Sequence, residues 1–416
     1  MAEVVRTKKN RGATEKFYRA TARKFLISTD VGETEESISQ GLSNSYINHL
    51  MHNLVEYDSE NIVDLIVDDY LKVCPDERVM IVYHEYNMEF AKKLIIKARR
   101  TGAKYRTSIR TKELSQDLWS SLPIKRVKGY YDQISEDIDW ADIWINLGRY
   151  SKPEFSGIPQ QRIERIAAIR DSAMSKLSLN SEKRGLMLYI PPFEKGFFED
   201  RDIIERVQMY LKALSLDKSD FKKVKSISEL ILDKPDLRIE SGQHNVLQVK
   251  FDKDCYFIDA GPYTESSRMS GFYSLPSGEL GMLPIEGGIN GDIYCEYCDR
   301  RIGEISGIRL RIKDNIVIDV KADKGLEILQ SLFDSFGVEG RTVSQVCFGM
   351  NSAITDVLLL PEMSSKKYGS IHITFGNNAV LGGTIKEPNT WSLISISPCV
   401  KSDTGLIMAD GKFDIQ

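Results

Sequence analysis

The chain has 416 residues, of which 42% are hydrophobic and 28% charged, and its formal net charge is −4. This length exceeds one ordinary hydrophobic core and predicts at least two domains, while the slightly negative charge argues against general nucleic-acid binding. No apolar stretch is long enough to span a bilayer, and no secretion signal opens the chain. We therefore expect a cytoplasmic protein with reduced cysteines that engages no membrane and no specific nucleic acid.

Residues 1–54 form a basic arm followed by a polar lead-in. Within residues 1–24, eight lysines and arginines stand against only two glutamates. Segments of this composition are usually solvated, so we expect a partly disordered arm. The alternative is that the basic side chains bind an acidic protein partner or nucleic acid.

Residues 55–240 alternate short apolar runs with amphipathic segments. Three runs are typical of buried strands, at 79–83, 142–148 and 186–191. Four segments are typical of helices, at 58–70, 90–98, 159–176 and after Asp202. Gly102 follows the second helix where a left-handed cap is expected. The alternation predicts an α/β domain with a mostly parallel sheet, and no Gly-rich phosphate loop supports a nucleotide site in it.

Residues 241–416 show a different sequence pattern, in which strand-like runs are separated by turns. The runs lie at 246–251, 255–260, 291–298, 305–312 and 315–322, and one helix is expected near 324–336. The dipeptides Asn290-Gly291 and Asp410-Gly411 are typical of hairpin turns. This segment is predicted to be an α+β domain with mainly antiparallel strands.

Several histidines and one closely spaced pair of cysteines are only weak candidates for metal ligands. Cys295 and Cys298 form a CxxC, but residues three apart on a strand point to opposite faces, and no second pair completes four zinc ligands. His49 and His52 have helical spacing without an accompanying carboxylate motif, and we interpret them as one helix face. His84 ends a predicted strand, where α/β folds often contact ligands.

Three phrases in the last part of the chain resemble the thermophilic metallo-aminopeptidase family, also called the aminopeptidase T family. They are SLPSGELGMLPIEGGINGDI (274–293), VCFGMNSAI (346–354) and YGSIHITFGNN (368–378), in this order. Iron-dependent dihydroxypyridine ring-cleaving dioxygenases share the fold of this family. The resemblance implies an aminopeptidase T-like fold and a homodimer.

In that family two divalent metals are held by carboxylates and histidines, and the resemblance implies where their ligands would fall. Glu279 matches the Glu of the Leu-Pro-x-Gly-Glu phrase, and His372 matches the His of the Gly-x-Ile-His phrase. Gln345 stands where the family has a second Glu. Ala379 stands near the place of a tyrosine, and the final His-x-Asp pair falls on Ser395 and Ser397.

These replacements predict the loss of paired-metal chemistry. Two dications need several carboxylates, and two surviving ligands rarely retain a metal. We therefore expect no cofactor and a catalytically degenerate protein that binds a peptide or small molecule in the inherited cleft, as a substrate-presenting or scaffold partner. Glu279 is the candidate catalytic residue, and His372, Gln345, Ser395 and Ser397 are the candidate ligand-binding residues.

A rearranged site is the alternative. Glu279 and His372 could then hold one divalent metal such as zinc, cobalt or manganese, with a further donor such as the thiol of Cys399. The chain would in that case be a metal-dependent aminopeptidase.

Overall fold

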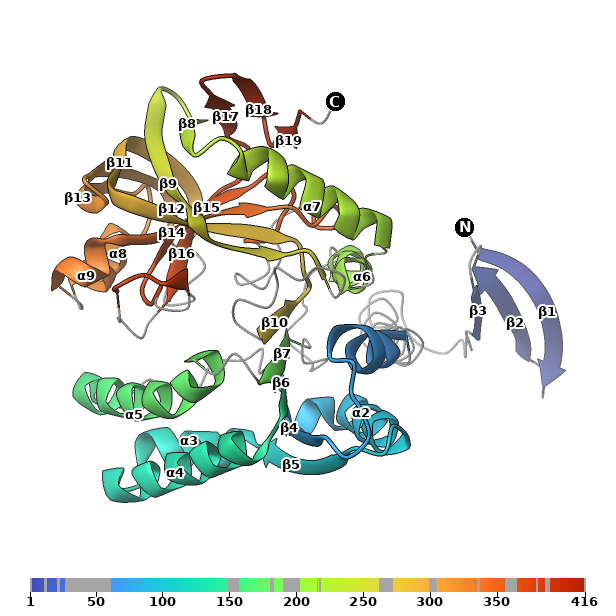
Figure 1. The fold of residues 1–416 in the computed structure, drawn as a ribbon. Helices are drawn as coiled ribbons and strands as arrows, with labels where there is room; N and C mark the ends of the chain where they lie inside the picture. The colour runs from blue at the N-terminus through green and yellow to red at the C-terminus, as the bar shows by residue number, and fades with distance from the viewer. Residues whose placement is uncertain are drawn as a thin grey trace. The chain divides into compact units, whose positions relative to one another are not determined.

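The computed structural model divides the chain into two compact units, Met1–Leu54 and Val55–Gln416 (Figure 1). The residues that it describes are 2–10, 13–20, 23–26, 61–148, 157–179, 183–189, 203–214, 216, 218–261, 272–298, 305–334, 337–355, 365–378, 381–385 and 390–414.

The first unit contains a three-stranded antiparallel sheet in place of the expected disordered arm. Its strands β1 (Ala2–Asn10), β2 (Ala13–Ala20) and β3 (Arg23–Leu26) pair in chain order. The prediction of disorder is wrong for these residues. The basic residues are interspersed with residues of high β-propensity, among them Val4, Phe17, Tyr18 and Phe25, and these residues favour strands over coil.

A five-stranded parallel sheet lies in the first half of the second unit, and it confirms the predicted α/β fold. Its strands run in the order β10-β7-β6-β4-β5. They are β4 (Arg78–His84), β5 (Lys104–Arg110), β6 (Ile143–Gly148), β7 (Arg184–Tyr189) and β10 (Phe272–Leu275). The last of these comes from far along the chain and pairs in parallel with β7.

Helices alternate with these strands, as the apolar periodicity predicts. They are η1 (Leu65–Tyr70), η2 (Glu85–Asn87), α2 (Met88–Arg100), α3 (Lys112–Ser120), α4 (Ile124–Trp140), α5 (Gln160–Leu179) and α6 (Ile203–Leu214). Gly102 has a φ of 87° just after α2, which confirms the left-handed cap. Within the part of the chain that the structure describes, no helix is both long and apolar enough to cross a membrane.

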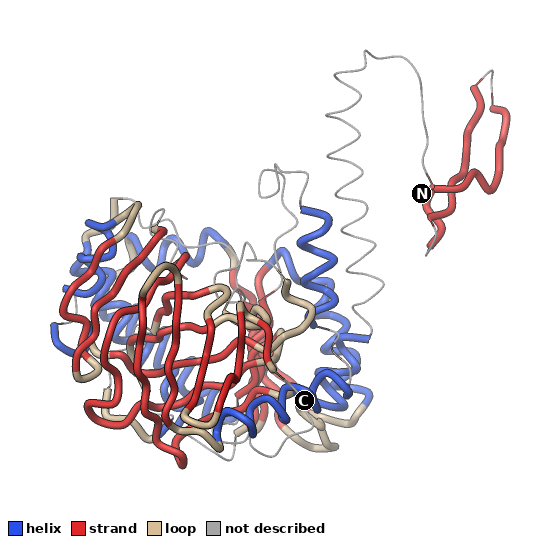
Figure 2. The backbone as a smooth tube through the Cα atoms, turned by 90° about the horizontal axis from the view of Figure 1, so that it is seen from above, coloured by secondary structure: helices blue, strands red, loops and turns tan. Residues whose placement is uncertain are grey.

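The rest of the second unit is built on an eleven-stranded sheet of mainly antiparallel pairs (Figure 2). Nine strands follow the order β14-β15-β16-β11-β9-β8-β17-β18-β19, and β12 and β13 extend from β11. The bounds are β8 (Asp236–Ser241), β9 (Asn245–Asp259), β11 (Glu279–Cys298), β12 (Ser306–Lys313), β13 (Ile316–Lys321), β14 (Val343–Gly349), β15 (Ile371–Phe375), β16 (Trp391–Ser395), β17 (Cys399–Ser402), β18 (Gly405–Ala409) and β19 (Lys412–Phe413).

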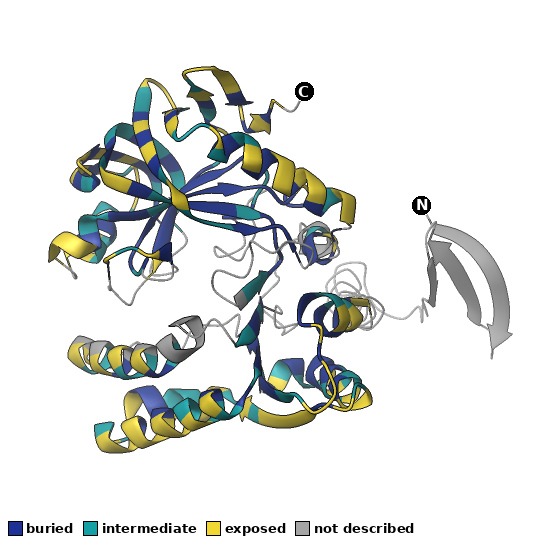
Figure 3. Ribbon diagram, viewed as in Figure 1, coloured by how far each residue is buried: buried dark blue, intermediate teal, exposed yellow. Residues whose placement is uncertain are grey.

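Hydrophobic side chains pack two helices, α7 (Lys218–Leu232) and α8 (Leu326–Asp334), against this sheet. The short helix α9 (Gly337–Arg341) contacts α8 and β13. Val224, Ile227 and Ile231 of α7 are buried in the same core as the strands. Phe333 of α8 makes edge contact with Phe375 of β15 at a ring distance of 5.1 Å. The central strands are accordingly buried (Figure 3).

The two hairpin signals behave differently. Asp410-Gly411 forms the turn between β18 and β19, with φ values of 46° and 72°, which confirms one prediction. Asn290-Gly291 lies inside β11, so the predicted hairpin there is wrong. A Cβ at Gly291 would overlap the carbonyl oxygen of Val246, so the glycine permits a close backbone approach rather than a turn.

Candidate functional site

Two rows of cross-strand neighbours bring the candidate residues to one face of the antiparallel sheet. In the first row Glu279 on β11 pairs with Asp259 on β9 and Gly349 on β14. In the second row Cys347 on β14 pairs with His372 on β15. Directly paired residues share a face, and so do residues two apart along a strand. The register therefore places Glu279, Cys347 and His372 side by side.

His372 and Glu279 form the centre of this site. The imidazole Nε2 lies 3.0 Å from Glu279 Oε1, but neither imidazole nitrogen has an aligned hydrogen-bond partner in the structure. The Nε2 contact is therefore a close polar contact whose geometry is not that of a formed hydrogen bond. Glu279, His372 and the thiol of Cys347 place their donor atoms within 4.8 Å of one another, and His372 is only 3% exposed.

Lys366 brings a buried positive charge to the same place. Its Nζ donates to Asp259 Oδ2 at 2.7 Å and to the carbonyl oxygen of Ser274 at 2.9 Å. Glu279 Oε2 lies 3.8 Å from the same nitrogen. Lysine is rarely buried unless it is paired, so this buried and paired ammonium is an integral part of the site.

Burial and pairing act in opposite directions on the acidic groups. Burial alone would raise the pKa of Glu279, but the facing His372 and the Lys366 ammonium outweigh it and lower the pKa below its usual value. Burial raises the pKa of Asp259, and Lys366 opposes that rise. Burial, followed by the nearby Glu279, raises the pKa of the Cys347 thiol well above its usual value. The resting thiol is therefore protonated and poorly nucleophilic.

A strip of neutral polar groups continues from Cys347 along the same face. The thiol contacts Gln345 Oε1 at 3.8 Å and Thr374 Oγ1 at 4.0 Å. The hydroxyls of Thr374 and Ser392 share a hydrogen bond of 3.0 Å. Amide, thiol and hydroxyl groups of this kind hydrogen-bond to neutral polar partners.

The structure brings together only some of the residues that the sequence singled out. Glu279, Gln345 and His372 lie on the shared face. Ser395 pairs with Ile371 of the hydrophobic core, which by register places it on the opposite face from His372. Ser397 is exposed and lies beyond the end of β16.

The remaining expected donors are equally separate. Ala379 lies outside the described residues. Cys399 begins β17, and its thiol donates to Asp410 Oδ1 at 3.5 Å. On β16 the positions that share the face of His372 are Ser392 and Ile394, and neither is a good ligand for a divalent metal.

The sequence alone did not indicate three residues of the site, which are Cys347, Lys366 and Asp259. Cys347 lies two residues after Gln345, so strand alternation could have identified it as a neighbour on the same face. Lys366 and Asp259 are separated by 107 positions. No local signal in the sequence marks them as a pair.

The other candidate groups lie elsewhere. His84 is buried at the end of β4, where its backbone N–H donates to Asn87 Oδ1 at 2.8 Å. Cys295 is buried in the hydrophobic core and Cys298 is half-buried beside it. His49 and His52 fall outside the described residues.

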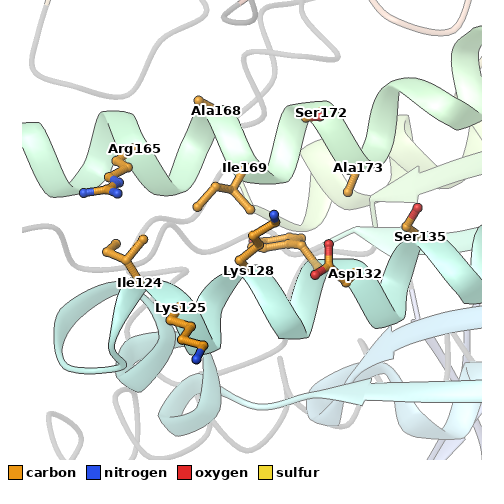
Figure 4. A pocket seen from close by; sticks show the side chains of 11 residues that line it. Ile124, Lys125, Lys128, Asp132, Ser135, Arg165, Ala168, Ile169, Ser172 and Ala173 are labelled. Carbon is orange, nitrogen blue, oxygen red and sulfur yellow. The ribbon is translucent and has the colours of Figure 1, made fainter.

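A separate pocket of about 750 Å³ opens between α4 and α5 (Figure 4). Its lining includes the cationic side chains of Lys125, Lys128 and Arg165 and the apolar side chains of Ile124 and Ile169. None of the predicted site residues lines it.

Comparison with known proteins agrees with this architecture. Residues 211–384 match the family model described as thermophilic metalloprotease (M29), which confirms the resemblance predicted from the three phrases. Wild-type AmpT from Thermus thermophilus has a similar structure, with a TM-score of 0.70 at 15% identity over 87% of this chain and 100% of that one.

A second solved structure, 2,5-dihydroxypyridine dioxygenase from Pseudomonas putida KT2440, is also similar. Its TM-score is 0.56 at 13% identity, over 90% of this chain and 98% of that one. At these identities both structures establish the fold alone. No curated protein matches the chain by sequence.

Proposed function

Because residues 211–384 match the thermophilic metalloprotease (M29) family and the fold is that of aminopeptidase T, we propose that this chain is a catalytically degenerate member of that group. In this proposal it binds a peptide or small molecule at the inherited site, as a substrate-presenting or scaffold partner. We place it in the cytoplasm as a homodimer. The observation that carries the proposal is the Lys366 ammonium, which lies against both carboxylates of the site.

The paired metals that the resemblance implies do not fit these residues. Two dications held close together need a set of carboxylates and imidazoles around them. Among the described residues, the only cluster of three metal-binding side chains consists of Glu279, Cys347 and His372. Gln345 contributes a neutral amide, and both carboxylates of the first row already face an ammonium.

The same residues suit the recognition of neutral polar groups. The amide of Gln345 and the hydroxyls of Thr374 and Ser392 can donate to and accept from peptide groups. His372 Nδ1 is buried without a partner, and a buried polar atom gains most from a ligand that satisfies it. In this proposal these residues orient a ligand and do not activate water.

The proposal is tested by measuring cleavage and binding on the same preparation. The wild-type protein is incubated with a panel of peptides that carry different N-terminal residues, with and without zinc, cobalt or manganese. We expect no release of N-terminal residues in any mixture. Calorimetric titration with the panel should find binding that weakens at least tenfold in Gln345→Ala, because the amide then contributes no hydrogen bonds.

The competing function is a metal-dependent aminopeptidase with a single rearranged site, and the convergence of Glu279, Cys347 and His372 favours it. It predicts peptide cleavage that requires added metal and disappears in Glu279→Gln. That outcome would contradict degeneracy. Absence of both cleavage and binding across the panel would contradict the ligand-binding role.

A further inference from the structure

Lys366 is anchored in the site by its backbone as well as by its charge. Its carbonyl oxygen accepts the N–H of Asn351 at 3.0 Å, and the next residue forms a bridge with the same asparagine. The following turn is tied to β14, because Gly349 N–H donates to the Ser370 carbonyl at 2.9 Å and Gly369 N–H donates to the Gly349 carbonyl at 2.9 Å. These backbone hydrogen bonds hold Lys366 in place, and they thereby fix the position of its buried ammonium group.

The space around this ammonium resembles a small cation cage. Three oxygens surround Nζ, from Asp259, Ser274 and Glu279, and Lys366 is only 4% exposed. Two of these oxygens belong to carboxylates that are also buried, and buried carboxylates need a cationic partner. In a metalloenzyme that partner is a divalent ion.

We propose that the Lys366 ammonium is a resident cation that substitutes for a divalent metal between Asp259 and Glu279, so that these two carboxylates have a cationic partner without metal. This inference rests on the proposed degenerate function and assigns its cause to one residue. Two features would then explain why this chain does not suit the family's pair of metals: the lost ligands and the positive charge of Lys366.

The distances support substitution rather than coexistence. A metal ion bound by a carboxylate lies about 2.0–2.2 Å from the oxygen, whereas Nζ lies 2.7 Å from Asp259 Oδ2. The ammonium therefore already occupies the region that an ion shared by both carboxylates would need. A dication at that point would also be repelled by the ammonium, strongly so in a buried setting where screening is weak.

The inference predicts that removing the ammonium converts the cage into a metal site. Lys366→Met keeps most of the length of the side chain and removes its charge, leaving two buried carboxylates without their ammonium partner. The matched control is Lys367→Met, which makes the same change in charge at the next residue, a half-buried lysine whose Nζ donates to the carbonyl oxygen of Tyr368 at 3.3 Å. Thermal unfolding and metal content are measured for both variants and the wild type.

We expect the wild-type Tm to be unchanged by a chelator or by added zinc or manganese. Lys366→Met should lower the Tm by on the order of 10 °C, because one partner of a buried pair is lost. Added zinc or manganese should raise the Tm of this variant and be retained at about one equivalent. Lys367→Met should show neither effect.

If Lys366→Met does not fold, the double variant Asp259→Asn/Lys366→Met keeps the inference testable. It removes both partners of the pair and should recover soluble, folded protein. The inference is overturned if purified wild type holds one equivalent of metal at this site, or if Lys366→Met behaves like Lys367→Met. The second result leaves the proposed function intact, since that function fails only on cleavage or on absence of binding by the wild type.

Discussion

Gly281 on β11 is predicted to be a position where one methyl group disturbs the site. It pairs with Phe257 on one side and Cys347 on the other, and it lies two residues from Glu279 on the same face. A Cβ built there would lie 2.6 Å from Phe257 Cζ and 2.8 Å from Cδ1, and closer still to Cε1. The glycine therefore makes room for the aromatic ring beside the site.

The magnitude follows from this overlap. Ordinary contacts begin at about 3.4 Å, so the ring must move by at least 0.8 Å, the difference between 3.4 and 2.6 Å. Overpacking of this kind costs about 1–3 kcal/mol of the free energy of unfolding. The half-buried position of Phe257 favours the lower part of this range, because its ring can swing partly toward solvent.

Chemical unfolding of Gly281→Ala, followed by circular dichroism, measures this cost. The control is Gly129→Ala in α4, where a Cβ meets nothing within 4 Å, and there the same substitution should stabilise the protein by roughly 0.5–1 kcal/mol. A second cycle places Gly281→Ala in a Phe257→Ala background. The reasoning is refuted if the Gly281→Ala penalty persists undiminished in that background.

Three further predictions concern other described residues. Cys74 is exposed whereas Cys347 is buried with a raised pKa, so mass spectrometry after alkylation of the native protein should find the first modified and the second protected. Burial raises the pKa of Glu296, so the folded state holds the proton of this carboxyl more tightly than the unfolded state. The contribution of Glu296 to the free energy of unfolding therefore falls as the pH rises through the pKa of the folded state, and Glu296→Gln should raise the Tm more at neutral than at acid pH. Thr111 accepts the N–H of Leu114 at 3.2 Å and caps α3, so Thr111→Ala should cost about 0.5–2 kcal/mol in denaturant unfolding, with no change indicating that the cap is dispensable.

The fold was largely predictable because buried strands leave an apolar run in the sequence. The strand at 143–148 is buried at every position, and its sequence IWINLG shows this directly. In contrast β5 is exposed or half-buried along its whole length, and its sequence KYRTSIR has no apolar run, so no strand was predicted there. Edge strands of this kind are identified by their pairing, which is a tertiary property.

The site was predictable where one phrase contains both the residue and its surroundings. Glu279 and His372 stand in such phrases, and the structure brings them to 3.0 Å. Ser395 was misjudged as their neighbour because the sequence does not give the register of β16 against β15. A shift of one residue exchanges the two faces of a strand, and the observed register places Ile394 beside His372.

The phrases themselves can persist without metal because several of their residues serve the backbone. A Cβ at Gly349 would overlap the carbonyl of Lys367, and a Cβ at Gly369 would overlap that of Gly411. Asn378 Nδ2 donates to the Ser344 carbonyl at 3.2 Å, and its Oδ1 accepts the N–H of Ile385 at 2.9 Å. Such residues are needed to close loops whether or not a metal is present. Resemblance at these positions therefore reflects the fold, and only the positions of the expected metal ligands, such as that of Gln345, bear on the chemistry.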